Sequence, residues 1–139
     1  MVVTMPATTA ATSTDVTLQV GQAYSRHEIG ALVGGGVLES LPHVEGTVVA
    51  ACLDPWLNPR APMEMVLEPD AFMLTWAQRF VDQGGDVPVF LREGDKVWRY
   101  VGRYRVTAST TDRHTLATRA RSLPHARPLG MAIDLAPVV

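Results

Sequence analysis

The stretch Val87–Thr107, VPVFLREGDKVWRYVGRYRVT, carries the clearest secondary-structure pattern in this sequence of 139 residues. Two β-rich runs, residues 87–92 and 97–107, flank the polar sequence Glu93-Gly94-Asp95-Lys96. A short polar loop with a glycine between two such runs is typical of a β-hairpin. The sequence therefore predicts an antiparallel pair of strands here.

Aromatic residues and arginines alternate along the second run of this hairpin. Because successive side chains of a strand point to opposite faces, Trp98, Tyr100 and Tyr104 are predicted to share one face, which packs in the core. Three arginines of the same run are predicted to share the other face, with a fourth on the adjoining strand: Arg99, Arg103, Arg105 and Arg92. Guanidinium groups present forked donors that match phosphate oxygens, so this face predicts nucleic-acid binding.

The charges are divided unevenly along the chain, although the formal net charge is only −2. Residues 1–91 carry three basic and ten acidic groups, whereas residues 92–127 carry nine basic and three acidic groups. Such asymmetry points to a polyanion partner, for which we favour DNA over RNA. Two alternatives stay open: the two segments neutralise each other within the fold, or they join two copies in a homodimer.

The sequence on either side of the hairpin predicts further short elements. Strands are expected at Val16–Val20, within the buried, central run Gly46–Leu53, at Met63–Leu67 and around residues 131–135. Helices are expected at Arg26–Val33, after the capping box Ser25-x-x-Glu28, after Asp70 up to Gly84-Gly85, and around residues 112–120. This order predicts an α+β fold, a small, strongly bent mixed sheet or pseudo-barrel with two or three short helices.

The composition places these elements in one domain. Residues 1–14, rich in Thr, Ala and Ser, are expected to be a disordered leader before a single α+β domain over residues 15–139. Cys52 is the only cysteine, and neither a signal peptide nor a run of the roughly 20 apolar residues that span a bilayer is recognisable. We therefore expect a cytoplasmic protein with no membrane partner.

Motifs for catalysis and for cofactor binding are missing from the sequence. There is no G-x-S-x-G or H-E-x-x-H, and Gly34-Gly35-Gly36 lacks the Lys-Ser/Thr of a phosphate-binding loop. The four histidines do not have metal-ligand spacing, and a hairpin turn explains Glu93 to Lys96 better than a nuclease metal site does. We expect no catalytic residue, metal or cofactor, and an enzyme acting on a nucleotide-like metabolite is the least supported alternative.

Trp56 lies in the sequence DPWLNPRAP (54–62), which has three prolines and predicts an irregular loop. A tryptophan in an irregular loop is harder to bury in a regular core than a tryptophan on a strand. Since aromatic rings of this kind stack flipped or single-stranded bases, Trp56 is a candidate for a pocket or an interface.

Several motifs occur together along residues 19–136: GQAYSRHEI (Gly21–Ile29), LNPRAP (Leu57–Pro62), VPVFLR (Val87–Arg92) and WRYVGRYRV (Trp98–Val106). In this order and spacing they resemble a bacterial domain found alone or fused to HNH-type restriction nucleases, within the PUA/EVE/SRA-like group of modified-base and nucleic-acid readers. The resemblance implies a PUA-like bent barrel with a concave pocket that reads a base. This sequence contains no His-Asn-His set, so cleavage by a fused nuclease is not implied for it.

Positions that match the motifs give candidate pocket residues. Tyr24, Arg26 and Asn58, together with Trp56 of the loop, are expected to shape the base pocket. The alternatives are a helix N-terminus for the Tyr-Ser-Arg sequence and a plain turn for the Asn-Pro sequence. The sequence thus favours a non-catalytic reader of nucleic acid that recognises a modified or flipped base, and the alternative is a protein-interaction or dimeric accessory module with complementary acidic and basic surfaces.

Overall fold

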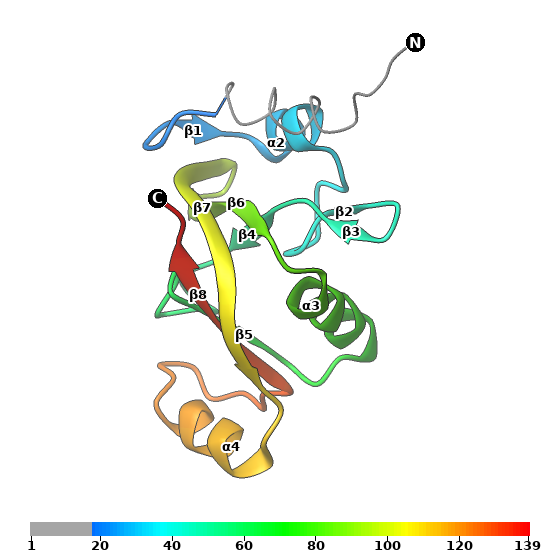
Figure 1. Ribbon diagram of the computed structural model, residues 1–139. Coiled ribbons are helices and arrows are strands. Elements are labelled where there is room, and N and C mark those ends of the chain that lie inside the picture. The colour runs from blue at the N-terminus through cyan, green and yellow to red at the C-terminus, as the bar shows by residue number, and fades with distance from the viewer. Residues whose placement is uncertain (1–17) are drawn as a thin grey trace.

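A computed structural model describes residues 18–139 of the chain (Figure 1). Its elements, in chain order, are β1 (Ala23–Tyr24), α2 (Arg26–Val33), β2 (His43–Val44), β3 (Thr47–Val48), β4 (Ala51–Leu53), β5 (Glu64–Leu67), α3 (Ala71–Gln83), β6 (Asp86–Gly94), β7 (Val97–Thr110), α4 (Arg113–Arg121) and β8 (Met131–Pro137). The main sheet has the order β4-β6-β7-β8-β5, with β1 paired to β7, while β2 and β3 form a separate pair.

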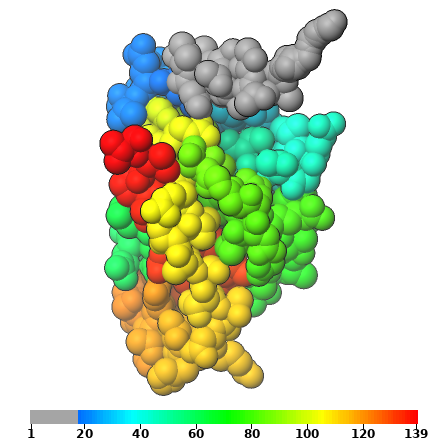
Figure 2. Space-filling model, in the orientation of Figure 1, coloured from blue at the N-terminus to red at the C-terminus, as the bar shows by residue number. Residues whose placement is uncertain are grey.

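The main sheet is mixed and strongly curled around β7, its longest strand. The β4–β6 pair is parallel and the other pairs are antiparallel. The register shifts twice between β6 and β7, at Val89/Phe90 and at Arg92/Gly94, and once between β7 and β8. Such irregularities bend and twist a strand. Figure 1 shows β7 running through the molecule from the β1 end to α4, and Figure 2 shows it beside β6 on the surface. The predicted α+β fold with a bent mixed sheet is confirmed, with three helices in the described residues.

The register shift between Val89 and Phe90 changes which residues of the hairpin share a face. Val89 pairs with Gly102 but the next residue, Phe90, pairs with Tyr100, so β7 holds one extra residue, Val101. Gly102 adopts a φ of +118°, which a side chain disfavours. Because paired residues point to the same side of a sheet, alternation along β7 is reversed at this bulge.

The predicted common faces of β7 are therefore wrong in one respect. Trp98 and Tyr100 pack in one cluster with Phe90, whereas Tyr104 packs in the other, with Val87. All three rings are buried, as expected. The arginines of β7 divide in the same way, so Arg103 and Arg105 lie on the opposite face from Arg99.

The two core clusters occupy opposite faces of the sheet, each covered by a helix. Ala77 and Phe80 of α3 pack against one face, and Ile29 of α2 packs against the other. A third, smaller cluster joins Leu116 of α4 to Val66 of β5 and to β8 at the far end of the sheet. No helix within residues 18–139 is long and apolar enough to cross a membrane.

The predicted helices are confirmed, and their caps explain where they begin. Ser25 Oγ accepts a hydrogen bond from Glu28 N at 3.1 Å while Glu28 Oε1 accepts one from Ser25 N at 2.8 Å, a complete capping box. Asp70 caps α3 and Asp112 caps α4, each through a carboxylate oxygen that accepts from a backbone amide at 2.9 Å. The same contact lowers the pKa of Asp112.

Two strand predictions need correction. The run Gly46–Leu53 is not one central strand, because β3 turns back onto β2 and β4 lies at the end of the sheet order. The Gln83 side chain forms hydrogen bonds with both the backbone N–H and the carbonyl of Val48. In Val16–Val20 the described residues 18–20 form no strand, because the chain turns there toward Gly21. Residues 16 and 17 and the expected leader at residues 1–14 lie outside the described residues.

Candidate functional site

A cavity of about 520 Å³ opens where α2, the segment after β4 and the β6–β7 hairpin come together. The N-terminus of α2 contributes Ser25, Arg26 and His27. The other elements contribute Val37, Leu38, Ser40, Cys52, Asp54, Leu57, Asn58, Arg92, Asp95, Lys96 and Trp98. The lining thus combines apolar side chains with donors and acceptors of both charges, as small-molecule sites do.

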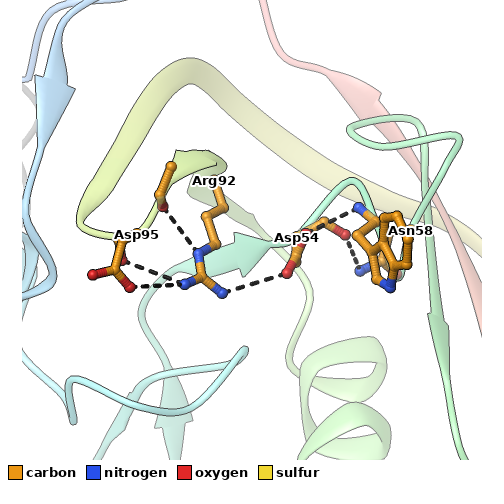
Figure 3. A network of polar contacts seen from close by, with 6 residues as sticks. Asp54, Asn58, Arg92 and Asp95 are labelled. Carbon is orange, nitrogen blue, oxygen red and sulfur yellow. Dashed lines mark hydrogen bonds and ion pairs between the residues drawn. The ribbon is translucent and has the colours of Figure 1, made fainter.

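Arg92 lies between two carboxylates at this cavity (Figure 3). One terminal nitrogen lies 3.5 Å from Asp54 Oδ2 and the other lies 3.5 Å from Asp95 Oδ1. Its Nε donates to the carbonyl oxygen of Gly94 at 3.0 Å, which fixes the side chain against the hairpin turn. Both ion-pair distances are long, so the guanidinium keeps donor capacity for a further acceptor.

Trp98 lies at the inner wall of the cavity with two guanidinium groups over its ring. The Arg26 and Arg92 groups lie 5.2 and 5.9 Å from the ring centroid, within cation–π range. Arg26 also donates to the carbonyl oxygens of Gly36 and Glu39, at 3.1 and 2.8 Å. Arg26 therefore holds the loop that supplies the apolar wall of the cavity.

Asp54 and Asn58 organise the loop on the opposite wall. Asp54 Oδ1 accepts from Trp56 N at 2.9 Å, and the Asp54 carbonyl accepts from Asn58 N at 2.8 Å. Asn58 is buried, and its Oδ1 accepts from Val66 N at 2.9 Å, so this amide ties the loop to β5. Asn58 thus positions the wall, since its side-chain oxygen and one amide hydrogen are used inside the fold.

Cys52 lines the cavity but is almost completely buried. Burial raises the pKa of its thiol to about 12, although the nearby Arg26 charge opposes that shift. The thiol is therefore protonated near neutral pH and has the character of a small apolar side chain. No cluster of three or more His, Cys, Asp or Glu side chains within residues 18–139 is arranged to hold a metal ion.

Three of the residues predicted from the sequence meet at this cavity: Arg26, Asn58 and Arg92. Tyr24 does not line it, because β1 pairs with β7 and buries the ring edge-on against Phe90 at 6.0 Å. Trp56 lines a neighbouring hollow of about 300 Å³ instead.

The three arginines of β7 also lie outside the cavity lining. Arg99 forms two hydrogen bonds to Glu93, at 2.6 and 2.7 Å, which lower the pKa of Glu93 and raise that of Arg99. Arg103 is paired with Asp86 beside another hollow of about 440 Å³. Arg105 is exposed and forms no ion pair with residues 18–139.

Sequence reasoning missed three charged residues of the cavity. The sequence predicts a hairpin turn at Asp95 and Lys96, which is confirmed, and the turn also lines the cavity. Asp54 begins the Pro-rich loop and had no motif of its own. A residue's place at a cavity depends on which distant segments meet there, and nothing local in the sequence reveals that.

Ion pairs within the fold account for much of the basic segment 92–127. Within residues 18–139, five of its nine basic residues pair with carboxylates, and most of these carboxylates precede residue 92. The paired residues are Arg92, Arg99, Arg103, Arg119 and Arg127. Neutralisation within the fold, left open by the sequence, is therefore a large part of the charge pattern.

Solved structures share this fold at low sequence identity. The SUVH5 SRA domain, in complex with hemi-methylated CG DNA, is 12% identical with a TM-score of 0.58, over 88% of this chain and 89% of that one. KRYPTONITE, in complex with mCHG DNA and SAH, is 11% identical with a TM-score of 0.61, over 88% of this chain and 32% of that one. The phosphorothioation-dependent restriction endonuclease ScoMcrA is 15% identical with a TM-score of 0.56, over 87% of this chain and 28% of that one.

These likenesses establish an SRA-like fold for the chain, in agreement with the PUA/EVE/SRA-like group that its motifs resemble. The fusion to HNH-type nucleases stays a prediction. No curated protein matches the sequence. The model of the family described as "Domain of unknown function (DUF6697)" matches residues 23–126, most of the chain, and the chain belongs to that family.

Proposed function

We propose that this chain is a DNA-binding reader domain whose cavity takes a modified base extruded from the duplex. The observation that carries the proposal is the cavity of about 520 Å³ at the hairpin end of an SRA-like sheet. Two of the similar structures are complexes with methylated DNA, and the third is an enzyme that depends on DNA phosphorothioation. Because a likeness at such low identity supports the fold alone, the case for base recognition must come from the residues of the cavity.

The lining suits a heterocyclic base. Val37, Leu57 and Trp98 supply apolar surface against which the faces of a flat ring can lie. Asp54 and Asp95 supply carboxylate acceptors for an exocyclic amino group, and Arg92 supplies donors for a ring nitrogen or carbonyl. An extruded base is recognised in this way, by hydrogen bonds to its edge and packing on its faces.

The cations around the cavity suit the phosphates that flank such a base. Lys96 lines the cavity and forms no ion pair with residues 18–139, and Arg26 and Arg92 lie beside it. Arg99 lies on the same hairpin, but its pairing with Glu93 must open before it contacts a phosphate. The binding surface in this proposal is therefore the hairpin end of the molecule, without Arg103 and Arg105.

In this proposal the domain binds DNA without cleaving it. Cys52, the one thiol, is buried and protonated, and the carboxylates Asp54 and Asp95 are held apart by Arg92. Neither group is arranged as an activated nucleophile or as a shared base. Incubation of the chain with labelled duplexes and Mg²⁺ should leave the DNA intact on a denaturing gel.

Fluorescence polarisation with labelled oligonucleotides tests the proposal. The probes are matched duplexes that are unmodified, hemi-methylated at CG, or phosphorothioated, and a single strand. We expect low-salt binding with a preference for one modified duplex. Arg92→Gln removes a recognition donor and should weaken binding of that duplex roughly 5- to 150-fold.

Arg113→Gln is the matched control, because Arg113 begins α4, at the opposite end of the molecule from the hairpin turn (Figure 1). Its affinity should stay close to that of the unsubstituted chain. Equal loss in the two variants would contradict recognition at the cavity, and no binding of any probe at low salt would contradict the proposed function as a whole.

A further inference from the structure

Trp56 presents an aromatic face to solvent next to the cavity. The residue is 65% exposed, although one ring face stacks on His125 with centroids 3.5 Å apart and planes at 25°. A ring covered on one side and still this exposed leaves its other face open. The other two tryptophans are more enclosed, since Trp98 is buried and Trp76 is stacked by His43.

The backbone of this loop is fixed before any ligand arrives. Asp54 Oδ1 holds Trp56 N at 2.9 Å, and the Asp54 carbonyl accepts from the next two amides, at 3.0 and 2.8 Å. Arg127, from the segment that carries His125, donates to the carbonyl of Leu57 and lies 3.3 Å from a carboxylate oxygen of Glu68. A ring held in this way loses little conformational freedom when something stacks on it.

The Trp56 hollow and the main cavity share a wall. Asp54 and Arg92 line both, and the two side chains form an ion pair at 3.5 Å (Figure 3). The hollow of about 300 Å³ is otherwise lined by Pro55, Glu93 and Gly94. A strand with one base in the cavity therefore has the Trp56 ring within reach of its next positions.

We infer that the Trp56–His125 pair forms a second site, a stacking platform for an unpaired nucleobase. That nucleobase is either next to the base in the cavity on the same strand or the one that was paired with it. The inference rests on the proposed function and adds a second unstacked base to it. Two chemical features support a base as the occupant. One is the open ring face, since every base has a π-face that stacks on an aromatic ring. The other is Arg92 in the shared wall, whose terminal nitrogens lie 3.5 Å from Asp54 and Asp95 and which keeps donor capacity for a phosphate next to that base.

The experiment uses duplexes that carry the modification preferred by the unsubstituted chain and 2-aminopurine at one neighbouring or opposed position at a time. The fluorescence of 2-aminopurine is quenched by stacking, so it reports where the probe base lies. We expect one position at which binding leaves the probe stacked, and Trp56→Ala should raise its fluorescence there. The same substitution should weaken binding roughly 5- to 150-fold, whereas Trp56→Phe retains a ring and most of the affinity.

Phe72→Ala is the matched control, because Phe72 is an aromatic side chain on α3 that is 59% exposed. It should change neither affinity nor the probe signal. Binding that Trp56→Ala leaves unchanged would overturn the platform and leave the proposed function intact, and it is also the result expected if Trp56 contacts a protein partner. Failure of the unsubstituted chain to bind any duplex would overturn both.

Discussion

At the scale of single residues, Cys52 shows how burial can keep a thiol protonated and unreactive beside a cavity. Its side chain lines the cavity, yet only 2% of the residue is exposed. A buried thiolate would lose its hydration, and the nearby Arg26 guanidinium is already engaged by the carbonyl oxygens of Gly36 and Glu39. The thiol therefore stays neutral, and its contribution to the fold is packing.

This burial predicts a loss of stability in alkali. The pKa of Cys52 is raised from an ordinary value of 9.0 to about 12, so above pH 9 the unfolded chain releases a proton that the folded chain retains. Stability from this group is complete below pH 9 and falls as the pH rises toward 12, by about 1.4 kcal/mol per pH unit. Urea unfolding between pH 7 and 11 measures the loss.

Cys52→Ala is the control for the alkaline experiment, since alanine fits the site and does not titrate. The difference in unfolding free energy between the two proteins should fall along the same pH range, after a constant offset for packing. Iodoacetamide should also modify the folded chain slowly at pH 8 and the unfolded chain quickly. Rapid modification of the folded chain would contradict a buried, protonated thiol.

At the scale of elements, the bulge in β7 is the feature that the sequence did not reveal. Period 2 predicted correctly that Trp98, Tyr100 and Tyr104 are buried. Its assignment of all three to one face is wrong, because one extra residue before Gly102 reverses the alternation. The glycine was visible in the sequence, but a glycine in a strand is compatible with a bulge or with close approach of another chain segment.

Gly102→Ala tests whether the bulge depends on glycine. The nearest atoms would lie 4.0 Å from an added Cβ, so space is available, but the φ of +118° is strained for any L-residue. We expect the substitution to lower the unfolding free energy by about 1–3 kcal/mol, measured by urea denaturation. Gly94→Ala, in the same hairpin and with neighbours also at 4.0 Å, lacks the positive φ and should be nearly neutral. Equal effects of the two would show that backbone strain is not the cause.

The cavity was only partly predictable for a related reason. Local patterns identified the capping box at Ser25, the hairpin turn at Asp95 and the Pro-rich loop at Asp54 as separate features. Each was assigned its structural role, and those roles are confirmed. Their meeting at one cavity results from the pairing of β1 with β7 and of β4 with β6, which are long-range contacts without a local signal.

At the scale of the whole molecule, a formal net charge of −2 conceals how the charged side chains are arranged. Some of them form ion pairs within the fold and others do not. Ion pairs such as Arg103–Asp86, Arg119–Glu64 and Arg127–Glu68 join the basic segment to the acidic first part of the same chain. These carboxylates and arginines already have partners, so fewer are left to join two copies. A homodimer built on complementary surfaces stays a prediction, which light scattering over an ionic-strength series tests.

The unpaired cations predict how salt should act on DNA binding. Lys96 lines the cavity and Arg105 lies in the middle part of β7, and neither forms an ion pair with residues 18–139. Each phosphate contact contributes about −0.9 to the slope of log K against log salt on duplex DNA. If DNA lies across the hairpin end, Lys96→Ala reduces the magnitude of this slope by about 0.9 and Arg105→Ala leaves it unchanged. Polarisation titrations at several salt concentrations measure both, and a larger change for Arg105→Ala would mean that DNA follows β7 instead of covering the cavity.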